Sequence, residues 1–296
     1  MGFTTNLKTI VVATDLSGRS EAALEYACKL ATACGARIVL AHGLDPLDYA
    51  AVDDVPEAVI DHMTEEARAA LDRMAADLLR AGIHSHSEVR QGEVAEMLVE
   101  VAIEHQAGLL VIGTRGMKGA GPVAVGSIAE QLVRLAPCPV LAVAADWNAG
   151  PHRPVQGGPV LLALECNAAA PAAAEAAYGL AEIFQRPLLV IHARSAGEDP
   201  SLNAEVLAEF AIRTGVPVKL TYIVADGEAA DAVASAIDQY RPCILVVGVK
   251  RATHFPGPHG TAFALLARSR VPVLCVPPDS VTDAEEKYAC VAADVV

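Results

Sequence analysis

The residues best suited to chemistry in this sequence form a glycine-rich stretch, Gly113 to Ser127. It lies between a short apolar run, 109–112, and an amphipathic run that begins at 128, which is the order strand, loop, helix. Ser127 stands at the expected N-cap, where unpaired amides and the positive end of the helix dipole attract anions. Glycines let the backbone approach a ligand closely, and they stand at 113, 116, 119, 121 and 126. The pattern predicts a phosphate site built from backbone N–H groups, and a glycine-rich surface loop is the alternative.

A second candidate residue follows the first apolar strand, 9–14. Asp15 stands there as Gly113 stands after the fourth strand. If these strands are neighbours, the crevice between their carboxyl ends is where an open α/β sheet binds ligands. Asp15 would then bond the base or ribose of a nucleotide or help hold a cation, and a role in the turn or in capping the next helix is the alternative.

Other known site types do not fit the sequence. The P-loop pattern fails because Val125 precedes Gly126-Ser127 and no lysine accompanies them. No Ser/His/Asp or Cys/His nucleophile arrangement can be placed, so no catalytic residue is assigned and we expect binding without fast turnover. His84 and His86 fall on one face of an alternating edge strand. An exposed polar edge is favoured over a metal site there, and no metal ligand is assigned.

Composition narrows the classes of partner and compartment. The chain has 296 residues, 53% of them hydrophobic, and a formal net charge of −14. Such an acidic chain argues against nucleic acid and anionic membranes as partners. The seven cysteines include no C-x-x-C pair, which favours buried reduced thiols. With no signal segment or membrane-spanning run, we expect a cytoplasmic protein.

The predicted elements that position the glycine-rich stretch occur twice in the sequence. Apolar runs at 9–14, 37–42, 109–112 and 139–143 recur in order at 160–164, 188–191, 244–247 and 271–276, with helical patterns between them. The predicted fold class is α/β, with two tandem doubly wound domains whose parallel sheets carry helices on both faces. We place the first domain at 1–147, a linker at 148–158, the second domain at 159–279 and an acidic tail at 280–296.

The motif Gly113-x2-Gly116-x9-Gly126-Ser127 resembles the ATP-binding signature of the universal stress protein (UspA-like) family. The strand end Ala13-Thr14-Asp15, His42 and the run Cys138-Pro139-Val140-Leu141 are similar to that family as well. The likeness covers both halves of the chain. It implies a five-stranded parallel sheet of order 3-2-1-4-5 in each half, which places the first and fourth strands side by side.

The resemblance also implies how ATP or ADP would be bound. Ala13 and Asp15 would lie near the adenosine, and the backbone of Gly43 would face the base. The ribose and phosphates would be bordered by Ile112 and Gly113. The phosphates, often with a bridging Mg or Mn ion, would be contacted by Gly116, Gly126, Ser127 and Ile128. Family members pair through their last strands, so an intramolecular pseudo-dimer is expected and a further homodimer is left open.

The second half departs from the signature. Gly248 is kept, but Arg251 stands at the position of the second glycine, Gly260-Thr261 comes one residue early and Glu165 replaces the aspartate. We therefore expect standard ATP binding only in the N-terminal half. The predicted function is stress-response regulation, in which an unidentified protein partner reads nucleotide occupancy. A slow ATPase or nucleotidyl transferase and a nucleotide-free interaction scaffold are the alternatives.

Overall fold

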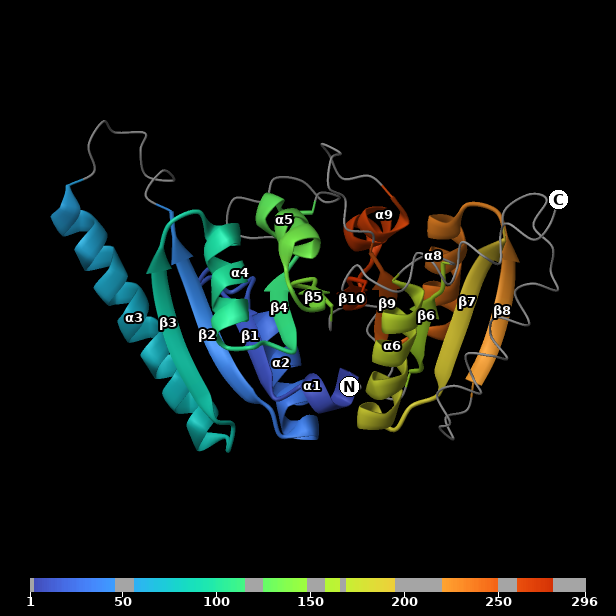
Figure 1. The fold of residues 1–296 in the computed structure, drawn as a ribbon, viewed down its shortest axis with the longest axis horizontal. Helices are drawn as coiled ribbons and strands as arrows, with labels where there is room; N and C mark the ends of the chain where they lie inside the picture. The colour runs from blue at the N-terminus through green and yellow to red at the C-terminus, as the bar shows by residue number, and fades with distance from the viewer. Residues whose placement is uncertain are drawn as a thin grey trace. The chain divides into compact units, whose positions relative to one another are not determined.

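A computed structural model describes residues 3–45, 56–114, 125–147, 158–165, 169–194, 220–249 and 260–278. The chain divides into two compact units, whose main parts are Thr5–Trp147 and Asn148–Val296. Each unit contains a parallel sheet flanked by helices (Figure 1). The predicted linker, apart from Gly158, and the predicted tail lie outside the described residues. Within the described ranges, none of the helices combines the length and hydropathy needed to cross a membrane.

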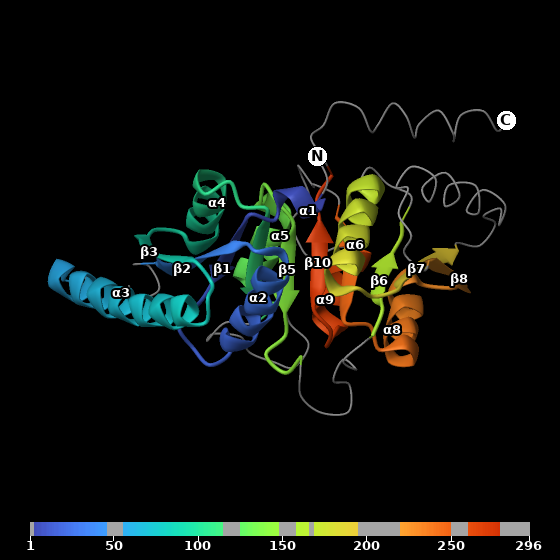
Figure 2. The same ribbon diagram turned by 90° about the horizontal axis from the view of Figure 1, so that it is seen from below.

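The first unit has five parallel strands in the order β3-β2-β1-β4-β5, which confirms the predicted order 3-2-1-4-5. The strands are β1 (Thr9–Ala13), β2 (Arg37–Leu44), β3 (Ser85–Gln91), β4 (Leu109–Gly113) and β5 (Val140–Val143). The helices are α1 (Phe3–Asn6), α2 (Glu21–Cys34), α3 (Glu57–Arg80), α4 (Val94–Glu104) and α5 (Ser127–Leu135). In Figure 2, α2 and α3 lie on one face of this sheet and α4 on the other.

The second unit repeats this order in its own strands. Its sheet reads β8-β7-β6-β9-β10, and all four pairings are parallel. The strands are β6 (Val160–Ala163), β7 (Leu188–Arg194), β8 (Leu220–Asp226), β9 (Ile244–Gly248) and β10 (Val273–Val276). The described helices are α6 (Ala170–Phe184), α8 (Ala229–Tyr240) and α9 (Thr261–Arg268). The internal duplication inferred from the sequence is therefore a duplication of one sheet topology.

The central strands form because their apolar side chains are covered on both faces. Val11 in β1 and Leu110 in β4 are completely buried, as is Leu161 in β6, and such continuous apolar runs are typical of parallel strands between two helical layers. The helix α2 covers the sheet with small and aliphatic side chains and ends at Gly35, whose φ of 71° is the left-handed conformation that favours glycine. The Gly35 N–H donates to the carbonyl of Ala31 at 2.8 Å.

Five cysteines lie in the described residues, and all five are free thiols. Cys138 and Cys275 are buried, while Cys28, Cys34 and Cys243 are half-buried. Burial raises the pKa of the Cys138 thiol to about 12. Burial raises the pKa of the Cys275 thiol to about 12 as well. At about pH 8 a thiol with such a pKa is ionised to roughly one part in ten thousand, and the thiolate is the nucleophile.

We expect iodoacetamide to modify Cys28 and Cys34 of the folded protein well before Cys138 and Cys275. The physical reason is that the second pair lacks both thiolate and solvent contact. Peptide mass spectrometry over a time course would measure the rate at each cysteine, with urea-unfolded protein as the control in which all react alike. Equal rates for Cys28 and Cys138 in the folded protein would contradict the prediction.

Candidate functional site

The candidate site lies where β1 and β4 end. The two strands are parallel neighbours, and Val12 pairs with Val111, so the carboxyl ends of both strands open at one edge of the sheet. The residue after each strand is hydrogen-bonded to the neighbouring strand on its outer side. The Thr14 N–H donates to the carbonyl of Ala41 in β2, and the Thr114 N–H donates to the carbonyl of Val143 in β5, both at 3.0 Å. The chain thus leaves β1 and β4 in opposite directions across the sheet. This divergence is the topological switch point at which open α/β sheets bind ligands.

Asp15 shapes the turn that follows β1. Its Oδ1 accepts hydrogen bonds from the Ser17 N–H at 3.0 Å and the Ser17 hydroxyl at 2.6 Å. The Leu16 N–H donates to the Thr14 hydroxyl oxygen at 3.0 Å, and Leu16 has a φ of 60°. A side-chain acceptor two residues back stabilises such a tight turn. The alternative turn role of Asp15 is therefore present in the structure, at the carboxyl end of β1 where a ligand role was also predicted.

The start of α5 corrects one prediction. Ser127 is the first residue of the helix, and the N-cap is Gly126, at φ −65° and ψ 145°. The reason is that the Gly126 N–H donates to the carbonyl of Thr114 at 2.9 Å, while the Gly126 carbonyl accepts from the Glu130 N–H at 3.0 Å. These two bonds fix the boundary between extended and helical backbone at the glycine. Because glycine has no side chain to cap the helix, the first-turn amides face outward without a side-chain acceptor at the N-cap position.

The remaining predicted ligand residues fall on both sides of this point. Ala13 pairs with Ala41, so Gly43 lies two residues further along β2. A Cβ at Gly43 would collide with Met97 Cε and come within 3.1 Å of Val94 Cγ1, which gives this glycine a packing reason. Ile112 is buried, so only its backbone could meet a ligand. Ser127 and Ile128 are exposed. Gly116 lies outside the described residues.

His42 and His192 make the same contact in the two units. His42 Nδ1 lies 2.8 Å from the carbonyl oxygen of Thr14, and His192 Nδ1 lies 3.0 Å from that of Leu164. Because a carbonyl only accepts, Nδ1 carries the proton in both rings. Each histidine thus ties the end of the first strand of its unit to the second strand. The repeated contact gives both histidines a structural role in their units.

Comparison with known proteins agrees with this architecture. Residues 6–144 match the model of the universal stress protein family. A universal stress protein of Thermus aquaticus is 34% identical over 137 residues, which are 46% of this chain and 98% of that protein. The chain belongs to the universal stress protein family.

Two further comparisons describe the layout within this family. A universal stress protein of Methanocaldococcus jannaschii is 30% identical over 138 residues, which are 46% of this chain and 81% of that protein. A solved universal stress protein of Archaeoglobus fulgidus matches with a TM-score of 0.76 at 19% identity, covering 92% of this chain and 97% of that one. At that identity the likeness shows the fold alone. Since the first two relatives match only about half of the chain, we describe it as a tandem universal stress protein.

The second unit is built differently at the corresponding strand ends. β6 and β9 are neighbours, as Ala163 pairs with Val247, and β9 ends at Gly248. A Cβ at Gly248 would lie 3.0 Å from the Cβ of Ala169, which is the buried N-cap residue of α6. Protein atoms therefore pack directly against the end of β9. Arg251 lies outside the described residues, and Glu165 is exposed.

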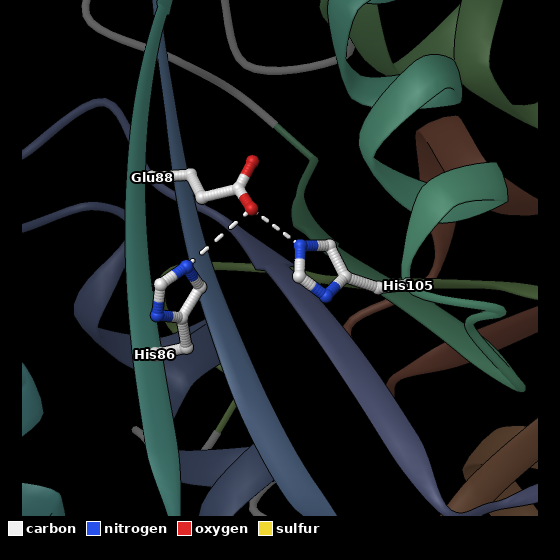
Figure 3. Close-up of side chains that lie close together, drawn as sticks. All are labelled: His86, Glu88 and His105. Carbon is white, nitrogen blue, oxygen red and sulfur yellow. Dashed lines mark hydrogen bonds and ion pairs between the residues drawn. The ribbon is translucent and has the colours of Figure 1, made fainter.

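Sequence reasoning missed a cluster of side chains elsewhere in the first unit. It consists of His86 and Glu88 from β3 and His105, the residue that follows α4 (Figure 3). His105 Nε2 is hydrogen-bonded to Glu88 Oε1, and His86 Nε2 lies 3.5 Å from the same oxygen. The sequence indicates only that His84 and His86 share a face of an exposed edge strand. The available signal was the alternation that places residues 86 and 88 on one face of the strand, together with the helix that must return across that face.

The other oxygen of Glu88 is held by an arginine. Arg90 donates to Glu88 Oε2 through Nε at 3.1 Å and Nη2 at 2.8 Å, and it also binds Glu104. Burial alone would raise the pKa of the Glu88 carboxyl, but hydrogen bonds and charge from His105 and Arg90 hold that pKa below its usual value. Glu88 is therefore ionised at neutral pH and stays oriented toward the two imidazole rings.

Proposed function

We propose that this universal stress protein binds ATP or ADP in its first unit and acts as a regulator whose nucleotide occupancy is read by a protein partner. The observation that carries the proposal is the Gly126–Thr114 hydrogen bond. It seats the glycine-capped start of α5 at the carboxyl end of β4, next to the end of β1. Outward-facing amides and a helix dipole at that place favour polyphosphate.

The resemblance to the family implies the remaining contacts of the ligand. The adenosine would lie toward Ala13, Asp15 and the backbone of Gly43, and the ribose against the backbone of Ile112 and Gly113. The phosphates would meet Gly116, Gly126, Ser127 and Ile128. Magnesium and manganese prefer oxygen ligands and retain several waters. The exposed Ser127 hydroxyl fits such an ion bridging the phosphates. Asp15 Oδ1 is engaged by Ser17, which supports binding without rapid turnover.

Isothermal titration of the full chain with ATP, in the presence of magnesium, tests this proposal. We expect one site per chain and weaker binding of AMP, because the predicted contacts are concentrated on the phosphates. Release of ADP, followed in the same sample, should stay slow over the titration. Absence of binding would overturn the proposal, and two equal sites per chain would overturn its restriction to the first unit.

A further inference from the structure

The cluster of His86, Glu88 and His105 has the composition of a metal site. Each residue offers one ligand atom, and the three atoms lie within 4.8 Å of one another. Two imidazoles and one carboxylate are the donor set of open zinc sites, in which the remaining coordination position is left to water. Magnesium and calcium prefer oxygen donors alone. The donor set therefore favours a late first-row transition metal, above all zinc.

The backbone presents these three side chains to a common point. His86 and Glu88 are two residues apart on β3, so they project from the same face of that strand. Their strand is held in register with β2, where His86 pairs with Val39 and Glu88 with Ala41. The odd-numbered neighbours face the other layer, since Ser85 donates to the carbonyl of Ala75 in α3. His105 reaches the cluster from the end of α4, where its N–H donates to the carbonyl of Val101 at 3.0 Å.

The distances suit coordination with small side-chain rotations. Zinc bonds to imidazole nitrogen and carboxylate oxygen are each about 2.0–2.2 Å long, so two ligands of a tetrahedral site stand roughly 3.3–3.5 Å apart. The 3.5 Å between His86 Nε2 and Glu88 Oε1 already has this value. His105 and Glu88 share a direct hydrogen bond, which an entering ion would replace. Figure 3 shows both imidazole nitrogens directed at the same carboxylate oxygen.

Partial burial and a supporting residue favour a site over a surface coincidence. The side chains of Glu88 and His105 are only 16% and 18% exposed, whereas that of His86 is 63% exposed. Glu88 and His105 are thus held in place by the surrounding protein, and His86 would complete the site from the solvent side. Arg90 orients Glu88 through its other oxygen, the supporting role that hydrogen bonds around metal ligands commonly have. The same Glu88 oxygen that binds His105 also has the His86 imidazole beside it, so two nitrogen donors face one carboxylate oxygen.

We propose that His86, Glu88 and His105 bind a zinc ion, with the remaining coordination open to water or to a ligand from another molecule. This site lies on the edge strand β3 and is separate from the proposed nucleotide site, since it uses none of the same residues. It would add a second, independent ligand to the first unit.

Cobalt(II) is the probe for the test, because its visible absorption reports coordination geometry. The folded full chain, with its accessible thiols alkylated so that they cannot bind metal, would be titrated with cobalt and then with zinc. We expect one cobalt per chain, intense bands of a four- or five-coordinate ion, and displacement by a stoichiometric amount of zinc. Absence of these bands at saturating cobalt would overturn the proposal.

Three variants assign the ligands. His86→Ala and His105→Ala should each weaken cobalt binding by about ten- to a hundredfold or more, while His84→Ala, which removes an exposed histidine beside the cluster, should leave it unchanged. Far-UV circular dichroism checks that each variant is folded, and the exposed His86 provides a ligand whose loss does not disturb the core. Equal weakening by His84→Ala, or unchanged binding in His86→Ala, would overturn the assignment.

Discussion

Replacing Ser127 by Asp is expected to remove ATP binding from the protein, while Thr261→Asp leaves it unchanged. Ser127 is the first residue of α5, directly after its glycine N-cap, and its side chain is exposed. A carboxylate there would face the phosphates of the proposed nucleotide, and a separation of about 5 Å serves to gauge their repulsion. At an effective dielectric constant near 20, the repulsion is roughly 3 kcal/mol for each unit of phosphate charge. That corresponds to a loss of at least about a hundredfold in affinity.

The design of this pair separates binding from folding. An aspartate in the first turn of a helix is favourable to the helix dipole, so Ser127→Asp should leave stability unchanged or slightly raised. Thr261 has the same place in the second unit, as the first residue of α9 after the N-cap Gly260. Thr261→Asp therefore adds the same charge at the corresponding helix of the second unit. Isothermal titration with ATP and thermal unfolding without nucleotide would be measured for both variants.

The outcomes distinguish three arrangements. Loss in Ser127→Asp alone supports a nucleotide site in the first unit. Loss in Thr261→Asp alone would move the site to the second unit and contradict the packing of Ala169 against Gly248 as an obstacle. Unchanged affinity in both variants would show that phosphate does not approach these helix starts.

The largest effect on stability is expected for Gly108→Ala. Gly108 immediately precedes β4, and its N–H donates to the carbonyl of Thr9 at 3.0 Å. A Cβ at this position would overlap the carbonyl group of Asn6 and lie 3.1 Å from the amide nitrogen of Leu7. These are backbone atoms that cannot rotate away, and Lys8 also donates to the Asn6 carbonyl. We expect a loss of roughly 2–4 kcal/mol in the free energy of unfolding of the first unit.

Gly18→Ala is the matched control for this substitution. The nearest atom to a Cβ at Gly18 is Glu21 Oε1 at 4.0 Å, so the added methyl group has room. Stability there should be unchanged or slightly raised, because alanine restricts the unfolded chain. Urea unfolding would give the midpoints, and hydrogen exchange with peptide resolution would show that the loss is confined to the first unit. Similar midpoints for both variants would contradict the prediction.

The positions of the strands could be predicted because the apolar runs that form them are local signals. Residues such as Val11 and Leu161 lie in continuous apolar segments, which mark strands buried on both faces. The same segments recur in the same order in the second half of the chain, which supports the assignment of each strand. The expected placement of β1 beside β4 follows from the family's order, and the Val12–Val111 pairing confirms it.

The details of the site were less accessible to sequence reasoning. Ser127 was predicted as N-cap because serine prefers that position, but a hydrogen bond from Gly126 to a residue twelve positions earlier sets the boundary. His84 and His86 are both exposed, as expected for a polar edge strand, but the approach of His105 from the following helix was not predicted. Both features depend on contacts between separate elements of the tertiary fold, which local propensity does not register.

The hydrogen bond that joins Gly126 to Thr114 also has an evolutionary consequence. This hydrogen bond joins Thr114, directly after β4, to Gly126, directly before α5. Residues between Thr114 and Gly126 can therefore be inserted, deleted or exchanged without displacing β4 or α5. The proposed ligand preference could therefore change without a loss of fold stability. In a duplicated chain, one unit could keep its ligand contacts while the corresponding segment of the other unit changes.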